Sequence, residues 1–286
     1  MGAGLLARYP QAKTYFDRAS AVLGYDLFEL CLNGPDERLN ATIHCQPALF
    51  VHSVAALAGL LEQQPDLMSS VVGTAGLSLG EYSALAAAGV LDFEDGVRLV
   101  QQRGAAMQAA AEAQPSGMAS ILGLSVEDVQ AVCDSACLPG EILQVANLLC
   151  PGNTAISGHK ASLDAAEVIA MQKGAMKFVR LAVAGAFHTA IMNPAVEQLK
   201  KAIASVSMKP ASIAIYSNVD AAPHTEPAEI SDLLSQQLVT PVRWEASLRA
   251  ILAAGVEQFY EIGAGRVLAG TLKRIDRKVA CECVGD

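Results

Sequence analysis

One stretch of this sequence, residues 71–85, constrains the fold more than any other. An apolar, strand-like run leads into the pattern Gly76-x-Ser78-x-Gly80, and an Ala- and Leu-rich helical pattern follows at once. In this strand–turn–helix context the serine stands at the end of a sheet as a nucleophile; the alternative is an ordinary Gly/Ser turn before a helix. Free N–H groups and the dipole at the helix N-terminus favour negative charge beside such a serine. Both glycines are expected to let the backbone pass close to neighbouring elements without a Cβ clash.

Composition excludes several classes of protein. The 286 residues are 52% hydrophobic and 17% charged, which suits a folded core and argues against disorder. A net charge of −9 argues against a nucleic-acid binder, which needs a basic face. No apolar run reaches membrane-spanning length without interruption, and the N-terminus lacks the pattern of a signal peptide. We therefore expect a soluble protein in the cytoplasm, or in the matrix of an organelle if a leader precedes Met1.

The spacing of the cysteines argues against a structural metal. Seven cysteines are scattered along the chain and lack the paired spacing of a zinc site. An odd number of cysteines in a chain of this length indicates reduced thiols. We expect no bound metal.

The pattern of expected strands and helices changes at two points along the chain. Helices are predicted at 11–23, 46–63, 92–113, 194–206, 230–238 and 244–254. Between residues 116 and 184, short strands alternate with two helices, which predicts a compact inserted subdomain of the βαββαβ kind. A βα alternation then returns. The sequence therefore predicts an α/β protein whose core comprises residues 1–115 and 185–286, with residues 116–184 as the insertion.

One basic residue interrupts an apolar helix face. Arg103 lies in the predicted helix 92–113 among apolar residues at helical spacing, which include Leu99, Val100 and Met107. A guanidinium there must extend to water, pair with a buried carboxylate, or face a cavity that receives an anion. Extension to water is the commoner case, but an anionic substrate competes with it on a helix that directly follows the serine turn.

A serine nucleophile needs a base, and His188 is the strongest candidate among five histidines. It follows the apolar run 181–187, where the insertion returns the chain to the core, and domain junctions favour clefts. The other four histidines lie beside an apolar helix or in polar loops. No acidic residue is placed to orient His188, which weakens a simple esterase interpretation.

Eight segments carry a family resemblance in consistent order along nearly the whole chain. They are residues 76–85, 102–107, 116–119, 146–147, 151–159, 185–189, 237–244 and 261–268. Together they resemble the malonyl-CoA:acyl-carrier-protein transacylases of bacterial and organellar fatty-acid synthesis. The resemblance implies an α/β-hydrolase-like core with a parallel sheet, and an inserted ferredoxin-like α+β subdomain.

The resemblance also implies a role for each matching residue. Ser78 is the implied nucleophile that attacks the malonyl thioester of coenzyme A, and His188 is the implied base. The backbone carbonyl of Gln237 would orient His188, and the N–H of Leu79 would supply half of the oxyanion hole. The implied substrate-binding residues are Arg103, which pairs with the malonyl carboxylate, and Met107, Phe187 and Asn147.

The implied reaction is a reversible ping-pong transfer of malonyl to the phosphopantetheine thiol of an acyl carrier protein, which supplies fatty-acid or polyketide chain elongation. It needs no permanently bound cofactor, no nucleic acid and no membrane, and we expect a monomer. Carrier proteins are acidic, so docking requires a local basic patch. The candidates are Lys173, Lys177, Arg180, Lys200 and Lys201, which otherwise form an ordinary solvated face.

Three features depart from the family pattern. Leu77 stands where most members carry a histidine, and Leu149 where many carry a second asparagine. The opening strand and a Gly-Gln-Gly segment, which would give the other oxyanion N–H, are expected just before Met1. Two alternatives therefore stay open: a serine thioesterase or hydrolase, which would not need Arg103, and a truncated, catalytically weak protein that binds carrier protein.

Overall fold

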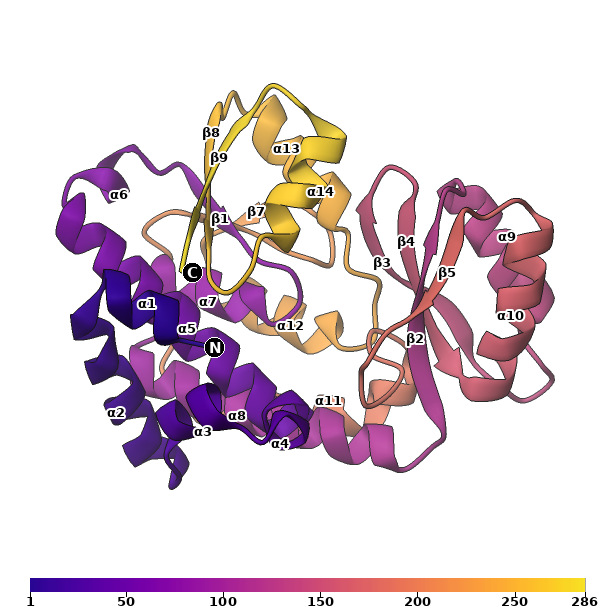
Figure 1. Cartoon of the computed structure of the whole chain (residues 1–286), viewed down its shortest axis with the longest axis horizontal. Coiled ribbons are helices and arrows are strands. Elements are labelled where there is room, and N and C mark those ends of the chain that lie inside the picture. The colour runs from indigo at the N-terminus through magenta and orange to yellow at the C-terminus, as the bar shows by residue number, and fades with distance from the viewer. Residues whose placement is uncertain (286) are drawn as a thin grey trace.

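The computed structural model describes residues 1–285 as a large main body and a smaller lobe, which Figure 1 shows side by side. The lobe comprises residues 116–180, and the main body contains the chain before and after it. Residues 3–70 form helices only, and from residue 73 onward helices and strands are interspersed, so the predicted α/β class is confirmed.

Helices make up most of the main body. Those before the lobe are α1 (Ala3–Arg8), η1 (Pro10–Ala12), α2 (Lys13–Leu23), α3 (Leu27–Asn33), α4 (Asp36–Asn40), α5 (Thr42–Gln63), α6 (Leu67–Ser70), α7 (Gly80–Ala87) and α8 (Phe93–Glu112). Those after it are η2 (Ala190–Met192), α11 (Asn193–Ala204), α12 (Pro227–Gln237), α13 (Trp244–Ala253) and α14 (Val267–Ile275). The six predicted helices are confirmed. Several of the short helices were not predicted, because they span too few residues for an apolar repeat.

The longest helix, α5, is apolar enough to cross a membrane by length and composition alone. In the structure 56% of its most apolar window is buried inside the protein, where it packs against α2, α7 and α8. Phe50, Val51 and Leu60 on this helix are fully buried. We therefore interpret α5 as the core helix of the main body.

The strands of the main body form two small sheets. β1 (Gly73–Ala75) pairs in parallel with β6 (Ala214–Tyr216), and β6 pairs antiparallel with β7 (Pro223–His224). β8 (Gln258–Ile262) pairs in parallel with β9 (Ala280–Val284), a strand that the sequence did not predict. A cavity of about 350 Å³ is lined by residues of both β1 and β8. The parallel pair β1–β6 and the parallel pair β8–β9 are therefore separate sheets that border the same cavity.

The smaller lobe has the predicted βαββαβ order. Its elements are β2 (Ser116–Leu122), α9 (Val126–Ala136), β3 (Leu143–Cys150), β4 (Asn153–His159), α10 (Lys160–Gln172) and β5 (Lys177–Arg180). The four strands are antiparallel in the order β3-β4-β2-β5, and both helices cover one face (Figure 1). The lobe buries its own hydrophobic core between Ala119 and Ala175, separate from the core of the main body.

Candidate active site

The predicted serine turn lies between β1 and α7. Ser78 has a φ of 51°, in the left-handed region that residues other than glycine rarely adopt and that is common at functional sites. A Cβ on Gly76 would lie 1.9 Å from the carbonyl carbon of Gly80, so only glycine fits there. A Cβ on Gly80 would meet nothing within 4 Å. The prediction that both glycines relieve a close approach is therefore wrong for Gly80.

We expect Gly76→Ala and Gly80→Ala to differ sharply. Gly76→Ala forces the turn apart, whereas Gly80→Ala changes the free energy of unfolding by about 0.5 kcal/mol or less, because the site has open space. Thermal unfolding, together with labelling of Ser78 by a fluorophosphonate, measures both the fold and the reactivity of the serine. Equal melting temperatures and equal labelling of the two variants would contradict the assigned geometry.

Three segments far apart in the chain bring a serine, a histidine and a carbonyl together. Ser78 Oγ lies 2.9 Å from His188 Nε2, and His188 Nδ1 lies 2.8 Å from the backbone oxygen of Gln237. A carbonyl only accepts, so Nδ1 carries the proton and Nε2 is free to accept the serine proton. Burial, together with the charge of Arg103, lowers the pKa of His188 to about 4. The imidazole is therefore neutral at pH 7 and able to act as a base.

The side chain of Gln237 contributes as well as its carbonyl, which the sequence did not predict. Its Nε2 donates to the backbone oxygen of Ser78 (3.0 Å) and to Glu81 Oε2 (2.7 Å), and its Oε1 accepts from Arg103 (2.8 Å). Gln237 ends α12, and an amide at a helix end gives no sequence signal of such a role.

Arg103 does not extend to water, because only 1% of it is exposed. From α8 it donates to Gln46 Oε1 (2.7 Å) and Ser78 Oγ (3.0 Å), besides Gln237. Its Nε has no hydrogen-bond partner in the described part of the chain, and its guanidinium carbon lies 5.1 Å from the ring centroid of Tyr82. Every acceptor that it reaches is neutral. A buried cation without an ion pair beside a nucleophile suits the binding of an anion.

The remaining predicted residues lie around this centre. Leu79 precedes the first turn of α7, where N–H groups lack an acceptor within the helix. Met107 is buried, with its Sδ 3.4 Å from Gln46 Nε2, so it supports the partner of Arg103. Phe187 packs with Met118, Ala146 and Ala155 between the lobe and the main body.

Two further residues that the sequence analysis named are Asn147, which matches the family motifs, and Leu77, which departs from them. Asn147 is buried in β3, and its Oδ1 has no hydrogen-bond partner among residues 1–285. Leu77 packs in an apolar cluster with Trp244, Leu248 and Leu272. Packing accounts for an apolar residue at position 77.

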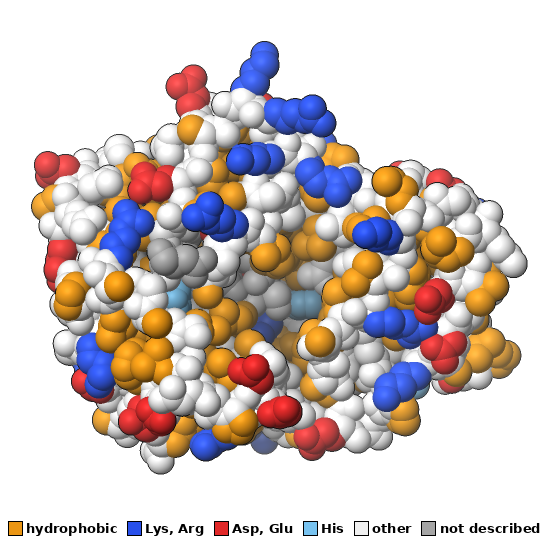
Figure 2. Space-filling view, viewed as in Figure 1, with side chains coloured by type: hydrophobic (Ala, Val, Ile, Leu, Met, Phe, Trp, Pro, Cys, Tyr) orange, Lys and Arg blue, Asp and Glu red, His pale blue; other side chains and the backbone are white. Residues whose placement is uncertain are grey.

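The five basic docking candidates fall into two groups. Lys173 forms an ion pair with Asp128 (3.8 Å), Arg180 with Asp164 (2.7 Å) and Glu167 (3.1 Å), and Lys200 with Glu197 (3.1 Å). No ion pair joins Lys177 or Lys201 to an acidic group in the described chain. Figure 2 shows a hollow between the main body and the lobe, with basic side chains gathered above it where Figure 1 places α13 and α14. The sequence analysis did not consider these.

One group of potential metal ligands lies outside the serine site. Within residues 1–285, ligand atoms of Glu261, Cys281 and Cys283 lie within 4.8 Å of one another. The oxygens of Glu261 accept the N–H groups of Leu268 (2.9 Å) and Ala269 (2.7 Å), so this carboxylate caps α14. Burial raises the pKa of Cys281 to about 11, which keeps its thiol protonated.

Comparison with known proteins fits this geometry. The acyl transferase domain family matches residues 1–284. The mitochondrial malonyl-CoA–acyl carrier protein transacylase of Mus musculus is 41% identical over 97% of this chain and 76% of its own length. The chain is a member of the malonyl-CoA:acyl-carrier-protein transacylase family.

Solved transacylase structures share the fold. The acyl carrier protein S-malonyltransferase of Vibrio cholerae is 38% identical, with a TM-score of 0.93 over 100% of this chain and 92% of that one. The malonyl-transacylase PlMCAT, solved with the type II PKS acyl-carrier protein AntF, has a TM-score of 0.93 at 36% identity, over 99% of this chain and 92% of that one. The fold of the transacylases therefore extends over the whole described chain.

Proposed function

We propose that this chain is an acyl-carrier-protein S-malonyltransferase, which moves malonyl from coenzyme A to the phosphopantetheine thiol of an acyl carrier protein. The observation that carries the proposal is the contact of Ser78 with both His188 and the buried Arg103, which has no carboxylate within ion-pair distance among residues 1–285. This arrangement combines a nucleophile, its base and a receptor for a carboxylate. The family membership and the transacylase names of its relatives support it.

The first half-reaction forms an acyl-enzyme. His188 Nε2 takes the hydroxyl proton while Ser78 Oγ attacks the thioester carbonyl carbon, and the N–H of Leu79 stabilises the resulting oxyanion. Collapse of this intermediate breaks the carbon–sulfur bond, and His188 returns the proton to the departing thiol of coenzyme A. The carrier thiol then reverses these steps, so both half-reactions exchange one thioester for another.

Arg103 supplies the selectivity in this proposal. A planar guanidinium binds a carboxylate through two parallel N–H···O bonds, and a dry environment strengthens both of them. The free Nε and the terminal nitrogens that now bond neutral oxygens give Arg103 donors to spare for malonyl. A serine thioesterase or esterase has no use for this cation, so the buried Arg103 favours the malonyl transferase over that alternative.

The finer architecture belongs to the same proposal. The strand order and the connections of the lobe support a ferredoxin-like subdomain within residues 116–184. The serine turn between a parallel strand and a helix supports a hydrolase-like core made of residues 1–115 and 185–286. The two separate hydrophobic cores support this division.

The proposed partner is an acidic carrier protein that docks across the hollow of Figure 2. Among the five candidates, Lys177 and Lys201 have no ion pair within residues 1–285 to compete with a partner, unlike Lys173, Arg180 and Lys200. The basic side chains over α13 and α14 extend this surface. We infer that the protein works where its carrier protein is found, in the cytoplasm or in the matrix of an organelle.

Intact-protein mass spectrometry tests the proposal. After brief incubation with malonyl-CoA we expect a single malonyl adduct on Ser78, which discharges to added holo carrier protein faster than to water. An adduct that discharges mainly to water would favour the thioesterase, and no adduct would favour the catalytically weak carrier-binding protein.

The pH dependence of kcat/KM is expected to report the pKa of His188 in the free enzyme. Its pKa of about 4 lies below the usual 6.5, so the free enzyme keeps a neutral base until pH falls toward 4. Activity should therefore be flat between about pH 6 and 8 and half lost near pH 4. The unfolded chain protonates this histidine at a higher pH, so the contribution of His188 to stability falls as pH drops below 6.5. Glu81, whose pKa burial raises to about 7, contributes in the opposite direction. Assays at pH 7 after acid exposure control for unfolding. An acid limb centred near 6.5 that persists in Glu81→Gln, which removes the other buried group that titrates near neutral pH, would contradict the neutral, buried imidazole.

A further inference from the structure

Asn218 contacts the serine turn through both atoms of its amide. The side chain is fully buried, and it comes from the segment after β6, 140 residues away from Ser78. Its Oδ1 accepts the backbone N–H of Ser78 (2.7 Å), and its Nδ2 donates to the backbone oxygen of Gly76 (2.8 Å). These two bonds hold the peptide groups on either side of Leu77, directly before the serine, and occupy the N–H of Ser78.

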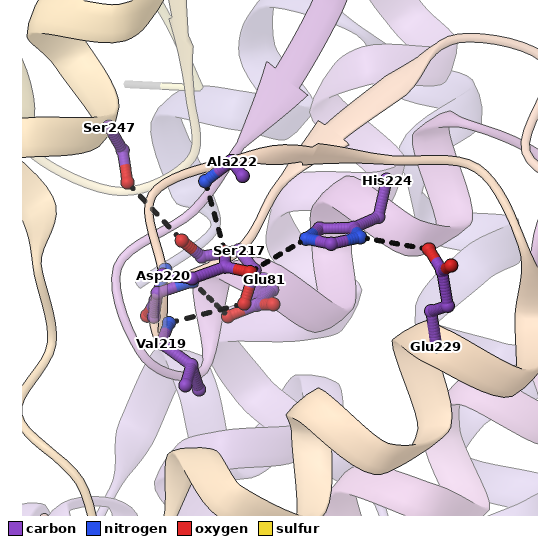
Figure 3. Close-up of polar contacts among 9 residues, drawn as sticks. Glu81, Ser217, Val219, Asp220, Ala222, His224, Glu229 and Ser247 are labelled. Atoms are coloured by element: carbon purple, nitrogen blue, oxygen red, sulfur yellow. Dashed lines mark hydrogen bonds and ion pairs between the residues drawn. The ribbon is translucent and has the colours of Figure 1, made fainter.

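The turn that presents Asn218 is itself held by a set of hydrogen bonds, several of which Figure 3 shows. Its bonds run from Val219 N–H to Ser217 Oγ (3.1 Å), from Ala222 N–H to Asp220 Oδ1 (3.0 Å), and from Ser247 Oγ to the Ser217 carbonyl (3.4 Å). His224 lies between Asp220 (3.0 Å) and Glu229 (3.1 Å), which ties the turn to α12. Asn218 therefore reaches the serine from a fixed support.

Glu81 connects the turn that carries Asn218 with Gln237, whose carbonyl orients His188. The carboxylate is 2% exposed, and its Oε2 accepts the backbone N–H of Asn218 (3.2 Å) and Nε2 of Gln237 (2.7 Å). Burial raises the pKa of Glu81 to about 7, while those two hydrogen bonds and the charge of Arg103 favour the ionised form. One buried oxygen thus connects the segment that holds Ser78 with the segment that holds His188.

We propose that Asn218 and Glu81 are positioning residues, which fix Ser78 and the Gln237 carbonyl in the geometry that the transfer reaction requires. Ser78 sits at a positive φ, a conformation that costs roughly 1–3 kcal/mol and persists only where its surroundings enforce it. The amide of Asn218 supplies that enforcement on the N-terminal side of the serine, through the Ser78 N–H and the Gly76 carbonyl. The N–H of Ser78 already donates to Asn218, so it is not available to an oxyanion. In this turn, the N–H of Leu79 is then the donor for the oxyanion.

Single-turnover acylation by malonyl-CoA tests this inference, which rests on the proposed function. For Asn218→Ala we expect the maximal acylation rate constant to fall by roughly 100-fold, because small displacements of a reacting atom have effects of that size. The concentration of malonyl-CoA at half-maximal rate should change little, since Asn218 makes no bond to Arg103. The matched control is Thr271→Val, which loses the buried bond from Trp244 Nε1 (2.9 Å). It should lower the melting temperature but leave the acylation rate constant unchanged.

Glu81 gives a second, independent pair of variants. An amide oxygen can still accept the two N–H groups, so Glu81→Gln should keep most of the acylation rate, whereas Glu81→Ala should lose it as Asn218→Ala does. This pair decides the question if Asn218→Ala does not fold. Folded Asn218→Ala or Glu81→Ala that acylates at the rate of the unsubstituted chain would overturn the inference. Absence of any malonyl adduct on the unsubstituted chain would instead defeat the proposed function.

Discussion

Replacing Ser78 with alanine is expected to abolish the malonyl adduct and to lower malonyl transfer by roughly 10⁴-fold or more. The substitution removes the attacking oxygen but leaves Arg103 bonded to Gln46 and Gln237, so malonyl-CoA still binds. Transfer to holo carrier protein, followed by mass spectrometry, measures the loss, and an affinity measurement with the carrier protein should show little change. Substantial transfer by Ser78→Ala would place the nucleophile elsewhere.

His188→Ala should show a loss of similar size, and the double variant should be little worse than either single one. The hydroxyl and the imidazole act as one unit through their 2.9 Å contact, so removing the second partner costs little once the first has gone. His159→Ala is the matched control. That histidine accepts the Ile142 N–H within the lobe and should leave transfer unchanged. Losses that multiply in the double variant would show that Ser78 and His188 act independently.

The residues that sequence alone pointed to are those that interrupt a local pattern. Ser78 stands in a glycine turn between a strand and a helix, and Arg103 stands on an apolar helix face. His188 follows an apolar run at the return from the insertion. The structure brings all three within hydrogen-bond distance of one another or of a shared partner. The carbonyl of Gln237, in contrast, was expected only from family resemblance, because its neighbours in sequence show nothing unusual.

The polar residues that connect these groups could not be predicted from the sequence. Gln46 bonds Arg103 across 57 positions, Asn218 bonds Ser78 across 140, and Gln237 bonds Glu81 across 156. Each appears in the sequence as an ordinary polar residue, since only the tertiary fold decides which polar groups are buried together. The wrong prediction for Gly80 has the same origin. The sequence shows two glycines in the turn, but only the fold shows that a Cβ would clash at Gly76 and would meet open space at Gly80.

Arg103→Ala is expected to separate malonyl from acetyl transfer. We expect kcat/KM for malonyl-CoA to fall by roughly 10³-fold, which corresponds to about 4 kcal/mol, a size typical of removing one partner of a buried charge pair. Acetyl-CoA has no carboxylate, and its transfer should be kept or raised. The variant retains the contact of Ser78 with His188 and the bonds of Gln237 to Glu81 and the Ser78 backbone, so the chemical machinery stays in place.

Two further substitutions show whether charge, shape or folding causes the change. Arg103→Lys keeps the charge but cannot bind a carboxylate through two parallel bonds, so malonyl transfer should fall to an intermediate level. Arg98→Ala, on the same helix, removes an exposed cation paired with Asp95 (2.6 Å) and should leave both acyl groups unaffected. Equal losses of malonyl and acetyl transfer in Arg103→Ala would contradict the carboxylate-binding role and would make Arg103 a structural support of Gln46 and Gln237. A selective loss of malonyl transfer would identify the buried guanidinium as the group that distinguishes a carboxylated acyl chain from a neutral one.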